Sequence, residues 1–156
     1  MSLEIGQNAP DFILYNTAKA EISLSAQKGK NVVLLFFPLA FTSTCTTELC
    51  AVRDDLEAYN SFNAMVFGIS NDSVFTLAKF KEEQHLNFDL LSDFNKTVSE
   101  AYNSLYSEFI LGMKGVSKRA VFVIDQEGVL RYAEILEKAG DLPNFNAIKE
   151  CLESLK

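Results

Sequence analysis

The fold of this chain can be predicted from NVVLLFF, residues 31–37, and from what lies on either side of it. This continuous apolar run, rich in Val and Phe, is typical of a strand buried on both faces of a mostly parallel sheet. Residues 64–69, AMVFGI, have the same character. Between the two runs, apolar side chains recur at steps of four, three, four and three residues: Cys45, Leu49, Val52, Leu56 and Tyr59. This spacing predicts one amphipathic helix, so the unit reads strand, helix, strand.

The rest of the chain continues the alternation and ends in a hairpin. Further helices are expected at 73–85 and 96–102, with a short strand at 88–91. Segments 120–125 and 129–134 predict two strands joined through Gly128, which can adopt the positive φ of a tight turn. A last helix begins after Pro143, with Phe145, Ile148, Leu152 and Leu155 on one face. This order is that of a thioredoxin-like α/β domain, in front of which residues 1–25 would add a β-hairpin.

Composition limits the function classes. A chain of 156 residues with 48% apolar residues is expected to form one domain, residues 1–156. A net charge of -7 repels nucleic acids and anionic membranes, so neither is expected as a partner. The longest apolar run, residues 32–41, is half a membrane span and is interrupted by Pro38. No signal peptide is recognisable at the N-terminus, and we expect a cytoplasmic protein.

The three cysteines are the first candidates for chemistry. An odd number of cysteines in a chain of this size indicates a reducing compartment and at least one useful thiol. The cysteines and His85 lack the paired spacing of a zinc site, so we expect neither a metal nor another cofactor.

The segment PLAFTSTCTTELC, residues 38–50, places a cysteine where its thiolate is favoured. Cys45 falls in the first turn of the predicted helix, where unpaired backbone N–H groups and the helix dipole stabilise negative charge. Thr42, three residues earlier, could direct its hydroxyl at the sulfur or at an oxygen bound to it, and Pro38 could stiffen and cover the loop. From these residues alone, an equally good interpretation makes Cys45 the first member of the apolar stripe and Thr42 a helix cap.

The spacing of Pro38, Thr42, Cys45 and Glu48 resembles the active-site pattern of the peroxiredoxins, which are thiol-dependent peroxidases. The similarity continues through Arg53 and Asp54, through LLSDF (90–94) and through SKRAVFVIDQEGVLRYAE (117–134). It is strongest to the bacterioferritin comigratory protein and one-cysteine alkyl hydroperoxide reductase E groups. Thr46 stands where many members have Pro, which departs from the typical two-cysteine pattern.

The resemblance implies a reaction and a role for each of four residues. Cys45 would be the peroxidatic cysteine that reduces hydrogen peroxide and organic hydroperoxides and becomes a sulfenic acid. Thr42 and Pro38 would shape its pocket, and Arg119 would hold the thiolate and polarise the peroxide. Without the resemblance, Arg119 would be interpreted as an exposed charge at the start of a strand.

The resemblance also implies partners. The enzyme would be recycled by a thioredoxin-like or low-molecular-weight thiol, and a homodimer is possible. A non-enzymatic alternative is a thiol redox sensor, in which oxidation of Cys45 changes a surface for a partner protein.

A second thiol is needed to reduce a sulfenic acid, and Cys50 is the first candidate. Cys50 lies about 100° around the helix from Leu49, off the apolar stripe. The bacterioferritin comigratory group often has its resolving cysteine at this offset of five residues. Cys151, at the edge of the stripe on the last helix, is interpreted as a structural, half-buried thiol. An external thiol is the remaining alternative.

A disulfide between Cys45 and Cys50 would require a change of conformation. In an intact helix their Cα atoms are about 8.6 Å apart. Disulfides require a separation below about 7 Å. We therefore expect oxidation to unwind the first turns of the helix before this bond closes.

Overall fold

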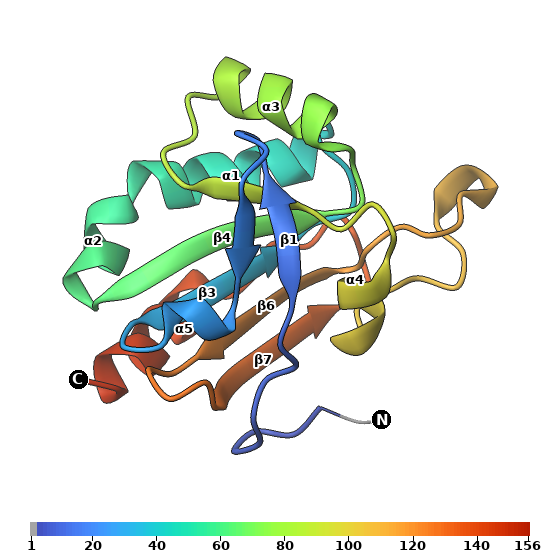
Figure 1. Ribbon diagram of the computed structural model, residues 1–156. Coiled ribbons are helices and arrows are strands. Elements are labelled where there is room, and N and C mark those ends of the chain that lie inside the picture. Colours follow the sequence, from blue (N-terminus) through green and yellow to red (C-terminus); the bar gives the residue numbers. More distant parts are fainter. Residues whose placement is uncertain (1–2) are drawn as a thin grey trace.

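The computed structural model describes residues 3–156, whose strands form one sheet with helices on both faces (Figure 1). The strands are β1 (Ile13–Asn16), β2 (Glu21–Ser23), β3 (Asn31–Phe36), β4 (Ala64–Ser70), β5 (Asp89–Ser92), β6 (Arg119–Ile124) and β7 (Leu130–Leu136). The α-helices are α1 (Ser43–Asp54), α2 (Leu56–Ser61), α3 (Val74–Glu83), α4 (Thr97–Ala101) and α5 (Phe145–Ser154). Two 3₁₀ turns lie at Ser25–Gln27 and Ile110–Gly112.

The sheet has the order β2-β1-β5-β4-β3-β6-β7. β3, β4 and β5 run parallel, whereas β6 is antiparallel to β3 and to β7. All six residues of β3 are buried, which confirms the interpretation of residues 31–37 as a central strand. The β6–β7 hairpin also forms as predicted, and Gly128 has a φ of 87° in its turn. The fold is therefore thioredoxin-like, with the predicted N-terminal hairpin made by β1 and β2.

The stripe from Cys45 to Tyr59 was predicted to lie on one helix, and this prediction is wrong. The helix is interrupted at Asp55, where the backbone leaves helical geometry with φ -116° and ψ 16°. The Asp55 carboxylate forms an ion pair with Lys149 of α5. Tyr59, in α2, is nevertheless buried, so the apolar stripe continues across the break.

Alternate side chains of β3 point to opposite faces of the sheet and belong to two different cores. Val33 and Leu35 pack with α1, α2, α3 and α5, whereas Val32 and Leu34 pack with α4 and the chain before β1. The first core contains Cys45, so the packing of α1 against the sheet fixes the position of this thiol.

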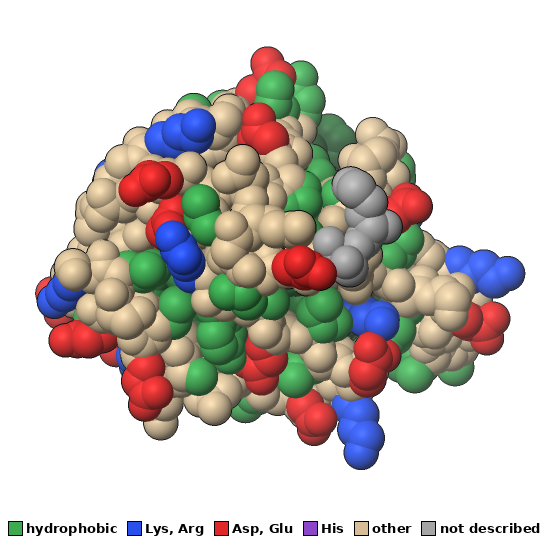
Figure 2. Space-filling view, turned by 90° about the horizontal axis from the view of Figure 1, so that it is seen from below, with side chains coloured by type: hydrophobic (Ala, Val, Ile, Leu, Met, Phe, Trp, Pro, Cys, Tyr) green, Lys and Arg blue, Asp and Glu red, His purple; other side chains and the backbone are tan. Residues whose placement is uncertain are grey.

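The face in Figure 2 carries Asp and Glu side chains spread among apolar and uncharged ones, with Lys and Arg between them. Nowhere in residues 3–156 is a helix long and apolar enough to cross a membrane.

Candidate active site

The loop that follows β3 brings Cys45 to the end of the sheet. Pro38 is buried two residues after the end of β3, and Phe41 has a left-handed backbone with φ 68° shortly before α1 begins. Thr42 is the N-cap, with φ -92° and ψ 154°, so Cys45 falls in the first turn as predicted. Cys45 is only 1% exposed. The first backbone N–H groups of a helix have no partner within it, so they can donate to a negatively charged group at this end of α1.

Arg119 reaches Cys45 from the neighbouring strand. It is the first residue of β6, next to Ala120, which pairs with Phe36 at the end of β3. Its Nη2 donates to Cys45 Sγ at 3.4 Å and to the Ala139 carbonyl at 2.8 Å. The Arg119 side chain is 1% exposed, so the interpretation as a surface charge is wrong.

Glu48 completes a buried group of charges and was given no role from the sequence. One turn after Cys45, it accepts a hydrogen bond from Arg119 Nη1 at 2.7 Å. Burial raises the pKa of Glu48 to about 7, although Arg119 acts in the opposite direction. Burial would lower the pKa of Arg119, but the charges of Glu48 and Cys45 outweigh this effect and raise it. Among the described residues, Glu48 Oε2 and Arg119 Nε have no hydrogen-bond partner.

The Thr42 hydroxyl makes a different contact from the one expected. It donates to the carbonyl of Leu39 in the same loop at 2.8 Å, and it does not cap α1. The structure therefore places Thr42 in the loop beside Cys45 without a hydrogen bond from its hydroxyl to the sulfur. Because this hydroxyl donates its hydrogen to a backbone carbonyl, its oxygen can still accept a hydrogen bond from a ligand.

The two remaining cysteines lie in different surroundings, and all three cysteines are free. Cys50 is half-buried on α1, and its thiol donates to Gln84 Oε1 at 3.5 Å. Cys151 is half-buried on α5, where burial raises the pKa of its thiol. Cys45 and Cys50 both lie within the uninterrupted helix α1. Because five helical residues separate their Cα atoms by more than a disulfide allows, no bond between them can form while α1 is intact.

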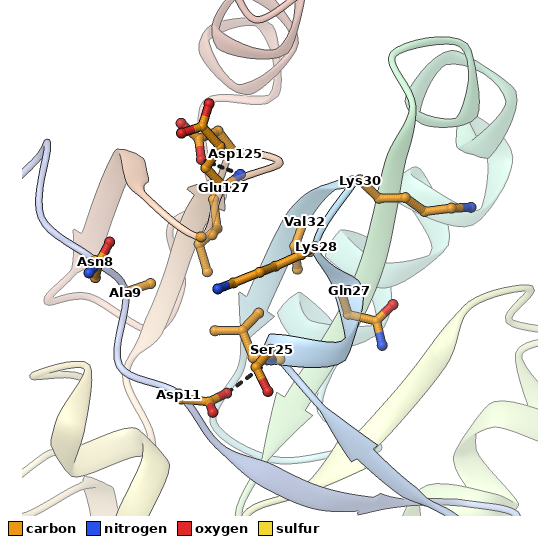
Figure 3. A pocket seen from close by; sticks show the side chains of 13 residues that line it. Asn8, Ala9, Asp11, Ser25, Gln27, Lys28, Lys30, Val32, Asp125 and Glu127 are labelled. Carbon is orange, nitrogen blue, oxygen red and sulfur yellow. Dashed lines mark hydrogen bonds between the residues drawn. The ribbon is translucent and has the colours of Figure 1, made fainter.

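A cavity at the other end of the sheet is not part of this site (Figure 3). It is lined by the start of β3, the end of β6 and the N-terminal segment, including Lys28, Val32 and Asp125. Cys45 follows the opposite end of β3, about 17 Å away at about 3.3 Å per strand residue. The buried contacts of Cys45, Glu48 and Arg119 therefore form the candidate site.

Sequence reasoning missed two groups in this site, for different reasons. Glu48 lies three residues after Cys45, on the same helix face, and this spacing could have indicated contact with Cys45 or its partner. The Ala139 carbonyl is a backbone group in the connection between β7 and α5, and no sequence signal identifies it.

Comparison with known proteins gives a consistent assignment. Residues 5–133 match the model of the AhpC/TSA family. The chain is 40% identical to "Peroxiredoxin Bcp" of Bacillus subtilis over 132 residues, covering 83% of each chain. The solved structure of "Peroxidoxin BcpB" from Mycobacterium tuberculosis superposes with a TM-score of 0.88 at 29% identity, covering 99% of both chains. A "peroxiredoxin-like protein" from Aquifex aeolicus gives a TM-score of 0.90 at 26% identity, covering 100% of this chain and 90% of that one.

Proposed function

The chain belongs to the AhpC/TSA family and is a peroxiredoxin, a thiol-dependent peroxidase, and we propose on this premise that Cys45 is its peroxidatic cysteine. The observation that carries the proposal is the contact between Cys45 Sγ and the buried guanidinium of Arg119, 3.4 Å away in the first turn of α1. A fixed cation beside the sulfur stabilises the thiolate, which is the nucleophile that peroxide reduction requires.

The proposed first step transfers one oxygen atom to sulfur. The Cys45 thiolate attacks the nearer peroxide oxygen, a sulfur–oxygen bond forms and the O–O bond breaks. The second oxygen leaves with the electron pair of the O–O bond and takes up a proton, so the products are a sulfenic acid and an alcohol or water. Negative charge moves from sulfur to the leaving oxygen, and Arg119 lies where it can stabilise that charge in the transition state.

Thr42 and Pro38 have supporting roles in this proposal. The Thr42 hydroxyl donates to the Leu39 carbonyl, so its oxygen can accept the O–H of a bound hydroperoxide and orient it toward Cys45. Pro38 is buried at the end of β3 and fixes the backbone from which this loop departs.

We propose that Cys50 resolves the sulfenic acid. The Cys50 thiol attacks Cys45, a disulfide forms, and the sulfenic hydroxyl leaves with the thiol proton as water. Because both residues lie in α1, this helix must partly unwind first. A thioredoxin-like or small thiol donor would then reduce the disulfide and return both cysteines to thiols.

Two further assignments belong to the proposal. Three free thiols suit the reducing environment of the cytoplasm.

A homodimer is supported by exposed aromatic side chains near the start of α1 and α3, where Phe75 is 70% and Phe41 49% exposed. Sedimentation of wild type and Phe75→Glu would test it, because a dimer through this surface should dissociate in the variant, whereas a monomeric wild type would refute it.

Steady-state turnover tests the proposed role of Cys45. With hydrogen peroxide and a regenerating thiol, wild type and Cys151→Ser should consume peroxide at equal rates, whereas Cys45→Ser should fall to the rate of the uncatalysed reaction. Activity retained by Cys45→Ser would contradict the proposal.

A further inference from the structure

A group of polar contacts at the end of α1 is not used by the peroxidase mechanism. The Cys50 thiol donates to Gln84 Oε1 at 3.5 Å, and Arg53 Nη1 donates to the Gln84 backbone carbonyl at 2.5 Å. In return, Asn87 Nδ2 donates to the Arg53 carbonyl at 3.2 Å. We call Arg53, Gln84 and Asn87 the latch, because their contacts join α1 to the end of α3 and the chain that follows it.

Local geometry explains why the latch forms. Gln84 is the C-cap of α3, so its carbonyl is one of those that the helix leaves without an internal partner. Arg53 lies one turn after Cys50, and its guanidinium is a suitable donor for such a carbonyl. His85 then adopts a left-handed backbone with φ 52°, after which Asn87 contacts α1. Cys50 and Arg53 are therefore held on the same side of α1 by the same residue of the neighbouring segment.

This arrangement conflicts with the second half of the catalytic cycle. For the Cys45–Cys50 bond to close, α1 must unwind, since the helical Cα separation of about 8.6 Å is too long. Movement of Cys50 out of the helix breaks its contact with Gln84 and displaces Arg53, which follows three residues later. Leu49 and Val52 also hold α1, through the apolar core, but they are separate from the polar contacts of the latch.

We propose that the latch sets the rate at which Cys50 reaches the sulfenic acid on Cys45, and thereby the fraction of Cys45 that is oxidised further. The inference rests on the proposed role of Cys50. While the latch is closed, the sulfenic acid waits in the intact site, where a second peroxide can convert it to a sulfinic acid and leave as water or an alcohol. When it opens, Cys50 attacks, the disulfide forms and water leaves. Arg53, Gln84 and Asn87 are thus positioning residues for the resolving step.

Two variants weaken the latch and leave the site around Cys45 intact. Gln84→Ala removes the acceptor of the Cys50 thiol, and Arg53→Met removes the donor to the Gln84 carbonyl but keeps an unbranched apolar chain. Glu83→Ala is the matched control, because Glu83 is exposed at the end of the same helix and has no part in the latch. Asn87→Ala, which truncates an exposed side chain, is a further variant should either of the first two fail to fold.

The experiment follows one turnover of reduced protein. After rapid mixing with hydrogen peroxide, acid quench and intact mass measurement give the rates of sulfenic acid and disulfide formation, and peptide mapping identifies the linked cysteines. We expect Gln84→Ala and Arg53→Met to form the Cys45–Cys50 disulfide about fivefold faster than wild type, the factor for one lost hydrogen bond. The sulfinic fraction at high peroxide should fall, and the rate of the first oxidation should stay within twofold of wild type. Amide hydrogen exchange within α1 of the reduced variants should be faster, and Glu83→Ala should match wild type throughout.

Each contrary result has a defined meaning. If wild type forms the Cys45–Cys50 disulfide and the latch variants form it at the same rate or more slowly, the latch proposal is overturned and the role of Cys50 stands. If peptide mapping finds no Cys45–Cys50 disulfide in wild type, the resolving role of Cys50 fails and the latch proposal fails with it.

Discussion

The guanidinium of Arg119 is almost fully buried and contacts both the sulfur of Cys45 and the carboxyl group of Glu48. A buried hydrogen bond from a charged donor stabilises its acceptor more than an exposed one does. Removal of the Arg119 guanidinium should therefore lower the reactivity of the Cys45 thiol. We predict that Arg119→Met lowers the rate of Cys45 alkylation at neutral pH and slows peroxide reduction about 10- to 100-fold. Alkylation rates measured across pH would check this. Arg119→Lys, which keeps the charge, should lose less, and equal rates in wild type and Arg119→Met would remove Arg119 from the site.

Thr42 acts, in our account, only when peroxide is bound, because in the free protein its hydroxyl contacts Leu39. Thr42→Val keeps the shape and removes the hydroxyl. We predict a loss of about 10²-fold in peroxide reduction, by analogy with removal of one group that stabilises a transition state. Stopped-flow measurement of Cys45 oxidation would show it, with Thr47→Val on the exposed face of α1 as the control. Thr42 would be an ordinary loop residue if its variant reacted as fast as wild type.

Glu48 should make the stability of the fold depend on pH. Burial raises the pKa of Glu48 from 4.5 to about 7, so the folded state retains a proton that the unfolded state releases. The contribution of Glu48 to the free energy of unfolding therefore falls as pH rises from about 4.5 to about 7 and is constant above that.

Denaturant unfolding of wild type and Glu48→Gln between pH 5 and 7 would isolate this effect, because the variant lacks the carboxyl group that titrates. The stability of wild type relative to the variant should decrease between pH 5 and 7. A difference that does not vary over this interval would mean that Glu48 is already ionised in the folded protein at pH 5.

For the individual site residues, the sequence predicted where in the fold a residue lies better than it predicted which groups that residue contacts. The position of Cys45 in the first turn of α1 follows from the helical spacing, whereas the position of Arg119 beside Cys45 was implied only by the family resemblance. The bond from Thr42 to Leu39 and the support of Arg119 by the Ala139 carbonyl depend on loop backbone, for which apolar periodicity carries no information.

Helix α1 is the element on which recycling depends, because it contains both Cys45 and Cys50. We predict that oxidation makes this segment less helical and less protected than it is in the reduced protein. Helix ends open at low cost, and Cys45 lies in the first turn. Circular dichroism and hydrogen exchange of the reduced and oxidised proteins would measure the change.

The cysteine variants should separate the two candidate resolving thiols. Cys50→Ser should accumulate sulfenic acid at Cys45 and overoxidise, whereas Cys151→Ser should form the same disulfide as wild type. An intramolecular disulfide that persists in Cys50→Ser would make Cys151 the resolving thiol. If neither substitution alters the oxidised species, an external thiol completes the cycle.

The helices and strands were predicted correctly where apolar residues recur along the sequence with the period of a helix or form a continuous run. Residues 32–36 of β3 and 64–69 of β4 form continuous runs without a polar side chain, and α5 has its apolar residues on one face, so all three elements are readily recognised. The break between α1 and α2 was missed because the apolar stripe continues through it, while Asp55 breaks the helix and pairs with Lys149, far away in the sequence.

The N-terminal extension is joined to the core of the molecule by Tyr102. Its ring packs at 5.4 Å from Phe36 and 5.0 Å from Phe122, and its hydroxyl donates to the Pro10 carbonyl at 2.6 Å. Tyr102→Phe keeps the packing and leaves that carbonyl without this donor. We predict a loss of about 1 kcal/mol and a fall in Tm of about 2–4 °C. Thermal unfolding would measure it, with peroxidase activity at 25 °C unchanged. An unaltered Tm would mean that water replaces the hydroxyl at no cost.

Cys45, buried at the start of α1 beside Arg119, is the thiol that we expect to react with peroxide first. The most direct measurement treats the reduced protein with one equivalent of hydrogen peroxide in the presence of a sulfenic acid trap and maps the modified peptides by mass spectrometry. We predict that the trap is found on Cys45 at the earliest times, and that the untrapped molecules go on to form a disulfide between Cys45 and Cys50. Trapping first on Cys50 or Cys151, with Cys45 still reduced, would contradict it.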